Sequence, residues 1–191
     1  MTRVYFVRHA QPDYRSETDR TRPLTDEGRR DSQAVLRFLQ DKQITAFYCS
    51  PYRRSMDTIA ASAQCYGQSI HTDERLRERE SGPDGNRHEL FRRRWADFDW
   101  HEPGGESLRS VQQRNIAALL DILEANRSQN LVIGTHGTAL STILNYFDSD
   151  FDCDSFLRII DWMPFIVELD FEDTTFLSKK EHIHVEKVYL P

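Results

Sequence analysis

Cysteine is scarce in this chain, with only Cys49, Cys65 and Cys153 among 191 residues. An odd, scattered set of thiols supports neither a disulfide framework nor a zinc site, and reduced thiols are typical of the cytoplasm. Long hydrophobic runs are also missing, because no segment reaches the roughly 18 to 20 apolar residues of a membrane span. The apolar run near the N-terminus is broken by Arg8 and His9, unlike a signal peptide. These absences predict a cytoplasmic protein with no membrane partner.

Positive charge is also in deficit, since the formal net charge is −6 at pH 7. That balance argues against nucleic acid or an anionic membrane as the main partner. The sequence shows no carboxylate cluster of the kind that holds magnesium, and two nearby histidines, His182 and His184, do not make a metal site. The length suits a single domain over residues 1–191, as a monomer or a homodimer.

Apolar segments with strand and helix periodicity alternate along the chain. Strands are expected at about 3–8, 46–49, 70–72, 131–136, 165–169 and 184–188. Helices are expected at about 26–40, from 52 to 66, at 89–98, at 106–125 and at 138–146. This alternation predicts an α/β fold, a three-layer α/β/α sandwich with a mostly parallel central sheet.

Two of the expected strands end on a histidine. The first runs into Arg8 and His9, and the strand near 131–135 ends on His136, where Gly137 opens a helix. The carboxyl ends of strands form the ligand-binding edge of open α/β sheets, and free N–H groups at a helix start favour an anion. Arg54 follows another strand and is expected at the same edge. The residues alone therefore predict an anion site, with one of the histidines as a candidate nucleophile.

Six segments in order carry a family resemblance. They are 8–10 (RHA), 23–28 (PLTDEG), 50–58 (SPYRRSMDT), 76–82 (LRERESG), 104–107 (GGES) and 135–137 (THG). Together they resemble the Arg-His-Gly, Leu-Thr-x-x-Gly, Ser-x-Leu-x-Arg-Ala-x-x-Thr, Leu-x-Glu…Gly, Gly-Gly-Glu-Ser and Thr-His-Gly motifs of the histidine phosphatase superfamily, also called phosphoglycerate mutase-like. Beyond about residue 147 the resemblance is only general.

The resemblance implies a role for each matching position. His9 would be the nucleophile that becomes phosphohistidine, while Arg8, Arg54 and His136 would hold the phosphoryl oxygens. Glu78 would protonate the leaving oxygen and then activate water. Arginine suits such a site because it stays charged and binds phosphate through two N–H groups at once. Because Arg8, Arg54 and the histidines supply the cationic groups, we expect no metal and no cofactor.

Three positions depart from the family pattern. Ala10 replaces the usual glycine, which is compatible with catalysis if its φ is negative. Pro12 stands where a phosphate-binding hydroxyl is usual, and Arg15 stands where many members have Asn. We expect Arg15 or Arg22, with Arg20 as a further candidate, to compensate or to bind a second anionic group of the substrate.

The favoured interpretation is a phosphatase that hydrolyses a small phosphorylated metabolite, with residues 78–106 as a short lid. One alternative is a cofactor-dependent phosphoglycerate mutase, whose site must exclude water to protect the phosphoenzyme. Another is a non-catalytic module that binds a phosphorylated ligand, although binding alone needs no acid such as Glu78. Glu106 is open to two interpretations, as a helix-start carboxylate or as a site residue.

Overall fold

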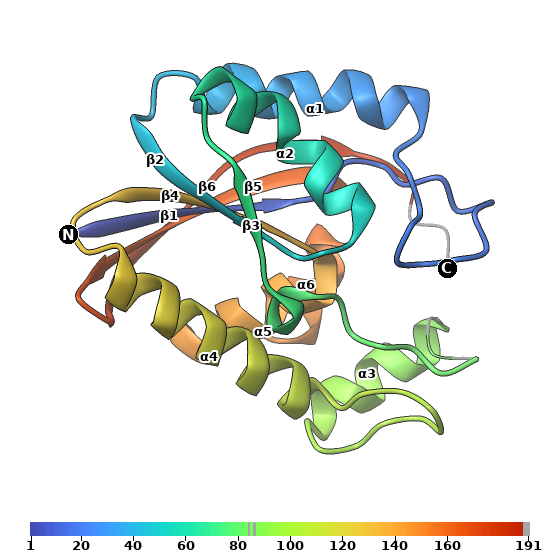
Figure 1. Ribbon diagram of the computed structural model, residues 1–191. Coiled ribbons are helices and arrows are strands. Elements are labelled where there is room, and N and C mark those ends of the chain that lie inside the picture. The colour runs from blue at the N-terminus through green and yellow to red at the C-terminus, as the bar shows by residue number, and fades with distance from the viewer. Residues whose placement is uncertain (84, 86, 189–191) are drawn as a thin grey trace.

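The computed structural model describes every residue except 84, 86 and 189–191. A six-stranded sheet lies at its centre (Figure 1). Its strands are β1 (Thr2–Arg8), β2 (Ile44–Cys49), β3 (Ile70–Thr72), β4 (Asn130–Thr135), β5 (Trp162–Glu172) and β6 (Thr175–Glu186). They are arranged in the order β3-β2-β4-β1-β5-β6. The first four in this order run parallel, and β5 and β6 pair antiparallel at one side.

Helices cover both faces of the sheet. They are α1 (Asp26–Leu39), α2 (Arg53–Cys65), α3 (His88–Ala96), α4 (Leu108–Ala125), α5 (Gly137–Phe147) and α6 (Cys153–Ile159). Figure 1 shows α1 and α2 on one face and α4, α5 and α6 on the other, with α3 beside α6. The predicted three-layer α/β sandwich is therefore confirmed. Within the described residues, no helix combines the length and the apolar character needed to cross a bilayer.

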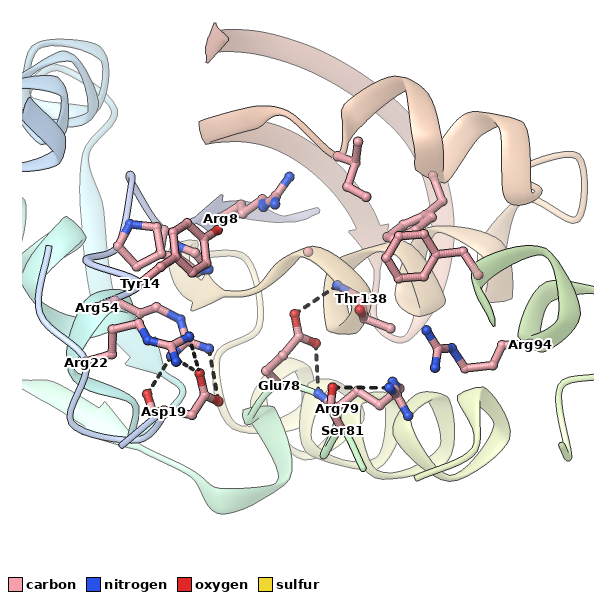
Figure 2. A pocket seen from close by; sticks show the side chains of 16 residues that line it. Arg8, Tyr14, Asp19, Arg22, Arg54, Glu78, Arg79, Ser81, Arg94 and Thr138 are labelled. Atoms are coloured by element: carbon pink, nitrogen blue, oxygen red, sulfur yellow. Dashed lines mark hydrogen bonds and ion pairs between the residues drawn. The ribbon is translucent and has the colours of Figure 1, made fainter. Parts of the chain in front are cut away.

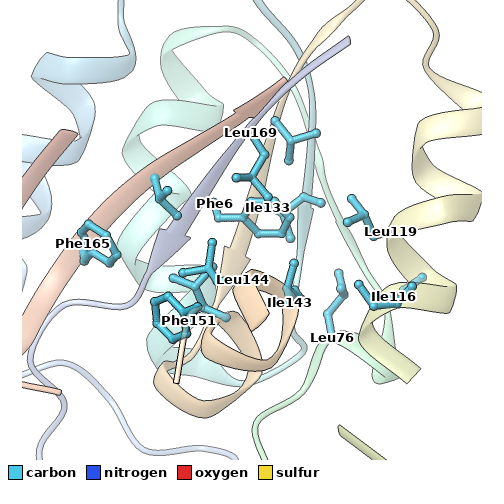
Figure 3. Packing of buried hydrophobic residues seen from close by; sticks show 14 of the residues in the cluster. Phe6, Leu76, Ile116, Leu119, Ile133, Ile143, Leu144, Phe151, Phe165 and Leu169 are labelled. Atoms are coloured by element: carbon cyan, nitrogen blue, oxygen red, sulfur yellow. The ribbon is translucent and has the colours of Figure 1, made fainter. Parts of the chain in front are cut away.

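The central strands are buried on both faces, which explains their near-continuous apolar sequences. On one face, Phe6 and Ile133 pack with Leu119 of α4 and Leu144 of α5 (Figure 3). On the opposite face, a second cluster joins the sheet to α1 and α2, and all its buried members are at most 4% exposed. β1 and β4 are therefore packed between two layers of helices, which fixes where their ends lie.

Strand register brings the two histidines together. In the parallel pair β1 and β4, Arg8 lies opposite Thr135, so the next residues, His9 and His136, emerge side by side. Their ring centroids are 5.3 Å apart. β2 pairs with the other side of β4, with Cys49 opposite Gly134, and so delivers Ser50 to the same edge. The predicted meeting of strand ends is thus a consequence of parallel pairing.

The C-terminal third differs most from the sequence prediction. Helix α6 has no predicted counterpart, and β5 and β6 are longer than the segments expected at 165–169 and 184–188. β6 is an edge strand whose side chains are mostly exposed, so its apolar pattern is weak. Helix α4 begins at Leu108 because the Ser107 side chain caps its first turn, two residues after the expected start.

Candidate active site

A pocket lies at the carboxyl ends of the central strands (Figure 2). Its described lining contains His9, five arginines and two carboxylates; these charged residues are Arg8, Arg22, Arg54, Arg79, Arg94, Asp19 and Glu78. In Figure 2, Glu78 lies between a group that includes Arg54 and, on the other side, Arg79 and Arg94. An excess of guanidinium groups among these residues suits an anionic ligand.

His9 is held as one tautomer. Its Nδ1 lies 2.8 Å from the carbonyl oxygen of Ala10, and a carbonyl can only accept, so Nδ1 carries the ring proton. Nε2 therefore keeps its lone pair. Burial, followed by the charges of Arg54 and Arg8, lowers the pKa of His9 well below its usual range. The ring is neutral near pH 7, as a nucleophilic imidazole must be.

His136 is fully buried beside His9. Its Nε2 lies 2.7 Å from the hydroxyl oxygen of Ser50. Its Nδ1 is buried and has no hydrogen-bond partner within the described part of the chain. Burial and the nearby Arg54 charge lower its pKa well below the usual range. A neutral ring with Nδ1 protonated would accept from Ser50 at Nε2 and offer one N–H to an anion's oxygen.

Arg8 is fixed by α6, a helix that was not predicted from the sequence. Its Nη1 donates at 2.6 Å to the carbonyl oxygen of Ile159, the last residue of α6. A side chain at Gly137 would meet the Arg8 guanidinium, since a Cβ there lies 3.1 Å from Nη2. Gly137 thus lets this cation approach the N-terminus of α5, where free N–H groups also favour an anion.

Arg54 is 4% exposed and lies on the first turn of α2. Its Nη1 donates to the Asp19 carbonyl at 2.7 Å and to the Asp19 carboxylate at 3.0 Å. Arg22 binds the same carboxylate at 2.8 Å, and its buried Nε has no partner among the described residues. Two arginines of the pocket are therefore bridged by one acid of the 11–23 loop.

Glu78 reaches the start of α5. Its Oε2 accepts from the N–H of Thr138 at 3.0 Å, and its Oε1 accepts from the N–H of Ala139 at 3.0 Å. The N–H of Arg79 also binds Oε1, at 2.8 Å. The Glu78 carboxylate thus occupies two N–H groups at the helix start, where an anion was expected to bind. It lines the same pocket as the arginines.

Three other arginines lie in different environments. Arg15 is not brought to the pocket: its side chain is 89% exposed and pairs with Asp13. Arg79 and Arg94 both bind Glu102, at 2.8 and 2.9 Å, and are nearly fully buried. Burial alone would raise the pKa of Glu102, but its hydrogen bonds, led by Arg79, lower it to about 2. Arg79, Arg94 and Glu102 all belong to the 78–106 segment, so these ion pairs cross-link the segment itself. Residues 84 and 86 of this segment lie outside the described part.

The substitution of Ala10 is accommodated by the backbone. Ala10 is not among the residues with positive φ, so an alanine fits the backbone here without strain. Its side chain is fully buried, and its N–H donates to the Thr58 hydroxyl at 2.9 Å. Pro12 lies in the pocket lining and pairs with Leu24 in an isolated bridge, so it shapes the wall without offering a hydroxyl.

A family model of the histidine phosphatase superfamily (branch 1) matches residues 4–178. The chain belongs to this superfamily. The probable phosphoglycerate mutase GpmB of Citrobacter koseri is 30% identical over 159 residues, 76% of this chain and 74% of that protein. The putative phosphoserine phosphatase 2 of Hydrogenobacter thermophilus is 28% identical over 167 residues, 75% of this chain and 77% of that protein.

Two solved structures have the same fold. YhfR of Bacillus stearothermophilus has a TM-score of 0.75 and 25% identity, covering 93% of this chain and 95% of its own. A mycobacterial glucosyl-3-phosphoglycerate phosphatase complexed with VO3 has a TM-score of 0.77, 18% identity and coverage of 97% and 99%. Membership of the histidine phosphatase superfamily supports phosphatase or mutase chemistry for this chain.

Sequence reasoning missed several residues of the site. Asp19 gave no signal, since it lies in a polar loop without periodicity. Arg79 and Arg94 belong to an arginine-rich stretch that resembles a solvated surface, and only the structure distinguishes these two. As for metals, no group of three or more His, Cys, Asp or Glu side chains that could hold an ion occurs among the described residues.

Proposed function

We propose that this chain is a phosphatase that hydrolyses a small phosphomonoester through a phosphohistidine on His9. The hydrogen bond between His9 Nδ1 and the Ala10 carbonyl carries the proposal. It leaves Nε2 unprotonated within an arginine-lined pocket, and the depressed pKa keeps the ring neutral. A neutral, oriented imidazole beside guanidinium groups is the arrangement that attack on an anionic phosphoryl group requires.

The first step transfers the phosphoryl group to the enzyme. Arg8, Arg54 and Arg22 bind its oxygens with the Nδ1–H of His136, and His9 Nε2 attacks phosphorus. The bond from phosphorus to the ester oxygen breaks, and Glu78 gives that oxygen its proton. Positioned cations stabilise the charge on the phosphoryl oxygens in the transition state.

The second step returns the enzyme to its starting state. Glu78, now a carboxylate, takes a proton from water as the water oxygen attacks the phosphorus of phosphohistidine. The bond between Nε2 and phosphorus breaks, inorganic phosphate forms, and Glu78 is again protonated. Water therefore replaces the leaving alcohol, and the net reaction is hydrolysis without a metal or an organic cofactor.

A mutase is the second candidate, supported by relatives named probable phosphoglycerate mutases at 30% identity. The two activities differ in which acceptor takes the phosphoryl group. The test supplies 3-phosphoglycerate with catalytic 2,3-bisphosphoglycerate and measures both products. We expect free phosphate to exceed 2-phosphoglycerate; efficient isomerisation with little phosphate release would assign the mutase activity instead.

The intermediate itself separates an enzyme from a binding module. After rapid mixing with an aryl phosphate, an alkaline quench preserves phosphohistidine, and peptide mapping should place it on His9. The matched variants are His9→Asn, which should form no phosphoenzyme, and His136→Asn, which should form it slowly. A phosphoenzyme on His136, or no turnover of any aryl phosphate, would contradict the proposal. A phosphometabolite panel that includes phosphoserine and 3-phosphoglycerate would then identify the substrate.

A further inference from the structure

One guanidinium group of α4 holds the backbone of the segment that carries Glu78. Arg114 Nη1 donates to the carbonyl oxygens of Arg75 and Arg77, at 2.8 and 2.7 Å. Its Nη2 donates at 3.0 Å to the carbonyl oxygen of Glu78 itself. Three carbonyls within four residues thus converge on a single side chain from a distant helix.

Glu106 fixes this guanidinium in turn. Its carboxylate accepts from Arg114 Nε at 3.0 Å and Nη2 at 2.9 Å, a bidentate geometry with high directional specificity. It also accepts from Arg77 Nη1 at 2.6 Å and from the N–H of Glu80 at 2.9 Å. All three charged side chains are at most 19% exposed, so water competes weakly for these bonds.

This network remains charged over the working pH range. Burial by itself would raise the pKa of Glu106, but the hydrogen bonds from Arg114 and Arg77 outweigh it and lower the pKa to about 2. Arginine does not lose its proton at ordinary pH. The bonds between Arg114, Glu106 and the Glu78 backbone are therefore present whatever the protonation state of Glu78.

We propose that Arg114, oriented by Glu106, is a positioning residue for Glu78. The proposal rests on the acid–base role of Glu78 in the proposed function. Three backbone N–H groups hold both Glu78 oxygens, and to donate a proton one oxygen must carry hydrogen and face the ester. The contacts of the Glu78 side chain therefore change during turnover. The contacts between the Glu78 backbone and Arg114 can stay the same throughout. A fixed main chain keeps the carboxyl within reach of the leaving oxygen.

The test uses two variants of Arg114. Arg114→Met keeps a long side chain and removes every hydrogen-bond donor. Arg114→Lys keeps the positive charge but loses the planar guanidinium group that donates several hydrogen bonds at once. Arg109→Met is the matched control, because Arg109 is on the same helix and its half-exposed side chain contacts Asp99 (Nε at 3.4 Å) and the Phe98 ring rather than the backbone around Glu78. Circular dichroism and thermal unfolding of each variant report whether the fold is retained. Release of the leaving group in the first turnover is then followed for an alkyl and an aryl phosphate.

We expect Arg114→Met to slow the alkyl phosphate by about 10- to 100-fold, a part of the usual range for acid–base catalysis. The aryl phosphate, whose leaving group needs little protonation, should change by less than about threefold. KM should be nearly unchanged, Arg114→Lys should lie in between, and Arg109→Met should behave as the wild type.

An equal loss on both substrates, or no loss on either, would overturn the positioning role. If Arg114→Met does not fold, Glu106→Gln is the second variant, because it weakens the contacts that orient Arg114. It should likewise slow the alkyl phosphate more than the aryl phosphate. A wild-type protein inactive on both substrates would instead refute the proposed function. The two failures are therefore distinguishable.

Discussion

The carboxylate of Asp19 lies against the guanidinium of Arg54 inside the pocket, with Nη1 and Oδ1 3.0 Å apart. Arg22 donates to the same carboxylate oxygen. A side chain of the protein thus occupies N–H groups that a phosphoryl group is proposed to use. Substrate and product must compete with Asp19 or displace it, which is possible because the Asp19 side chain is 48% exposed and lies in a loop.

Replacing Asp19 by Asn should therefore strengthen the binding of inorganic phosphate. Removing one negative charge beside the bound anion and releasing two arginines should lower the inhibition constant of phosphate by about tenfold, equivalent to about 1.4 kcal/mol. The measurement is competitive inhibition of aryl phosphate turnover.

Asp13→Asn is the control for that change, since Asp13 pairs with Arg15 away from the pocket. It should leave the inhibition constant of phosphate unaltered. Weaker phosphate binding by Asp19→Asn would show that Asp19 orients Arg54 rather than competing for it.

The proposed acid can be tested against its neighbour. Glu78→Gln keeps an oxygen for the N–H groups of α5 but has no acidic proton, so it should slow alkyl phosphates by about 10² to 10⁴-fold. Aryl phosphates should lose less in the first turnover. Glu80→Gln is the control, because Glu80 is 59% exposed and its carboxylate lies 3.6 Å from Arg77. A larger effect at Glu80 would reject the assignment.

The core of this site could be predicted from the sequence for a physical reason. Parallel strands have matching ends, so two apolar runs that each finish on a histidine must bring His9 and His136 to one edge. Arg54 follows because a helix starts directly after β2. Local sequence thus determines these positions once the sheet is parallel.

The supporting residues could not be predicted in the same way. Arg114 is a polar residue on a helix. Helical periodicity predicts the face of the helix on which Arg114 lies, but it does not predict which loop packs against that face. The bond between Arg8 and Ile159 joins residues 151 positions apart through a helix of seven residues, too short for a clear periodic pattern. Such contacts depend on tertiary packing.

Chelators should leave the activity unchanged. The cationic groups of the proposed mechanism are Arg8, Arg22 and Arg54, which remain charged in the absence of metal ions. The measurement is phosphate release in excess EDTA, followed by addition of magnesium, manganese or zinc. Loss of turnover in EDTA that any of these ions restores would contradict the metal-independent mechanism.

Folding stability should depend on pH through the two buried histidines. Burial lowers the pKa of His9 and His136 in the folded state, whereas in the unfolded chain a histidine titrates near about 6.5. Below that pH the unfolded state takes up protons that the folded state does not, so the free energy of unfolding falls. The contribution is complete well above about pH 6.5 and decreases by at most about 1.4 kcal/mol for each histidine at pH 5.5.

The histidine effect can be separated from that of the carboxylates. Glu102 and Glu106 have a pKa lowered to about 2 in the folded state. Their contribution to the free energy of unfolding is therefore lost only as the pH falls through the range in which an unfolded glutamate titrates, near about 4.3, and below it. Urea unfolding in phosphate-free buffer between about pH 7 and 5.5 therefore reports the histidines. His136→Gln should lose less stability than the wild type over this interval, by at most about 1.3 kcal/mol, because one buried neutral imidazole is gone. Parallel pH profiles for the two proteins would show that His136 takes up its proton at the same pH in the folded and unfolded states, which would contradict a pKa lowered by burial.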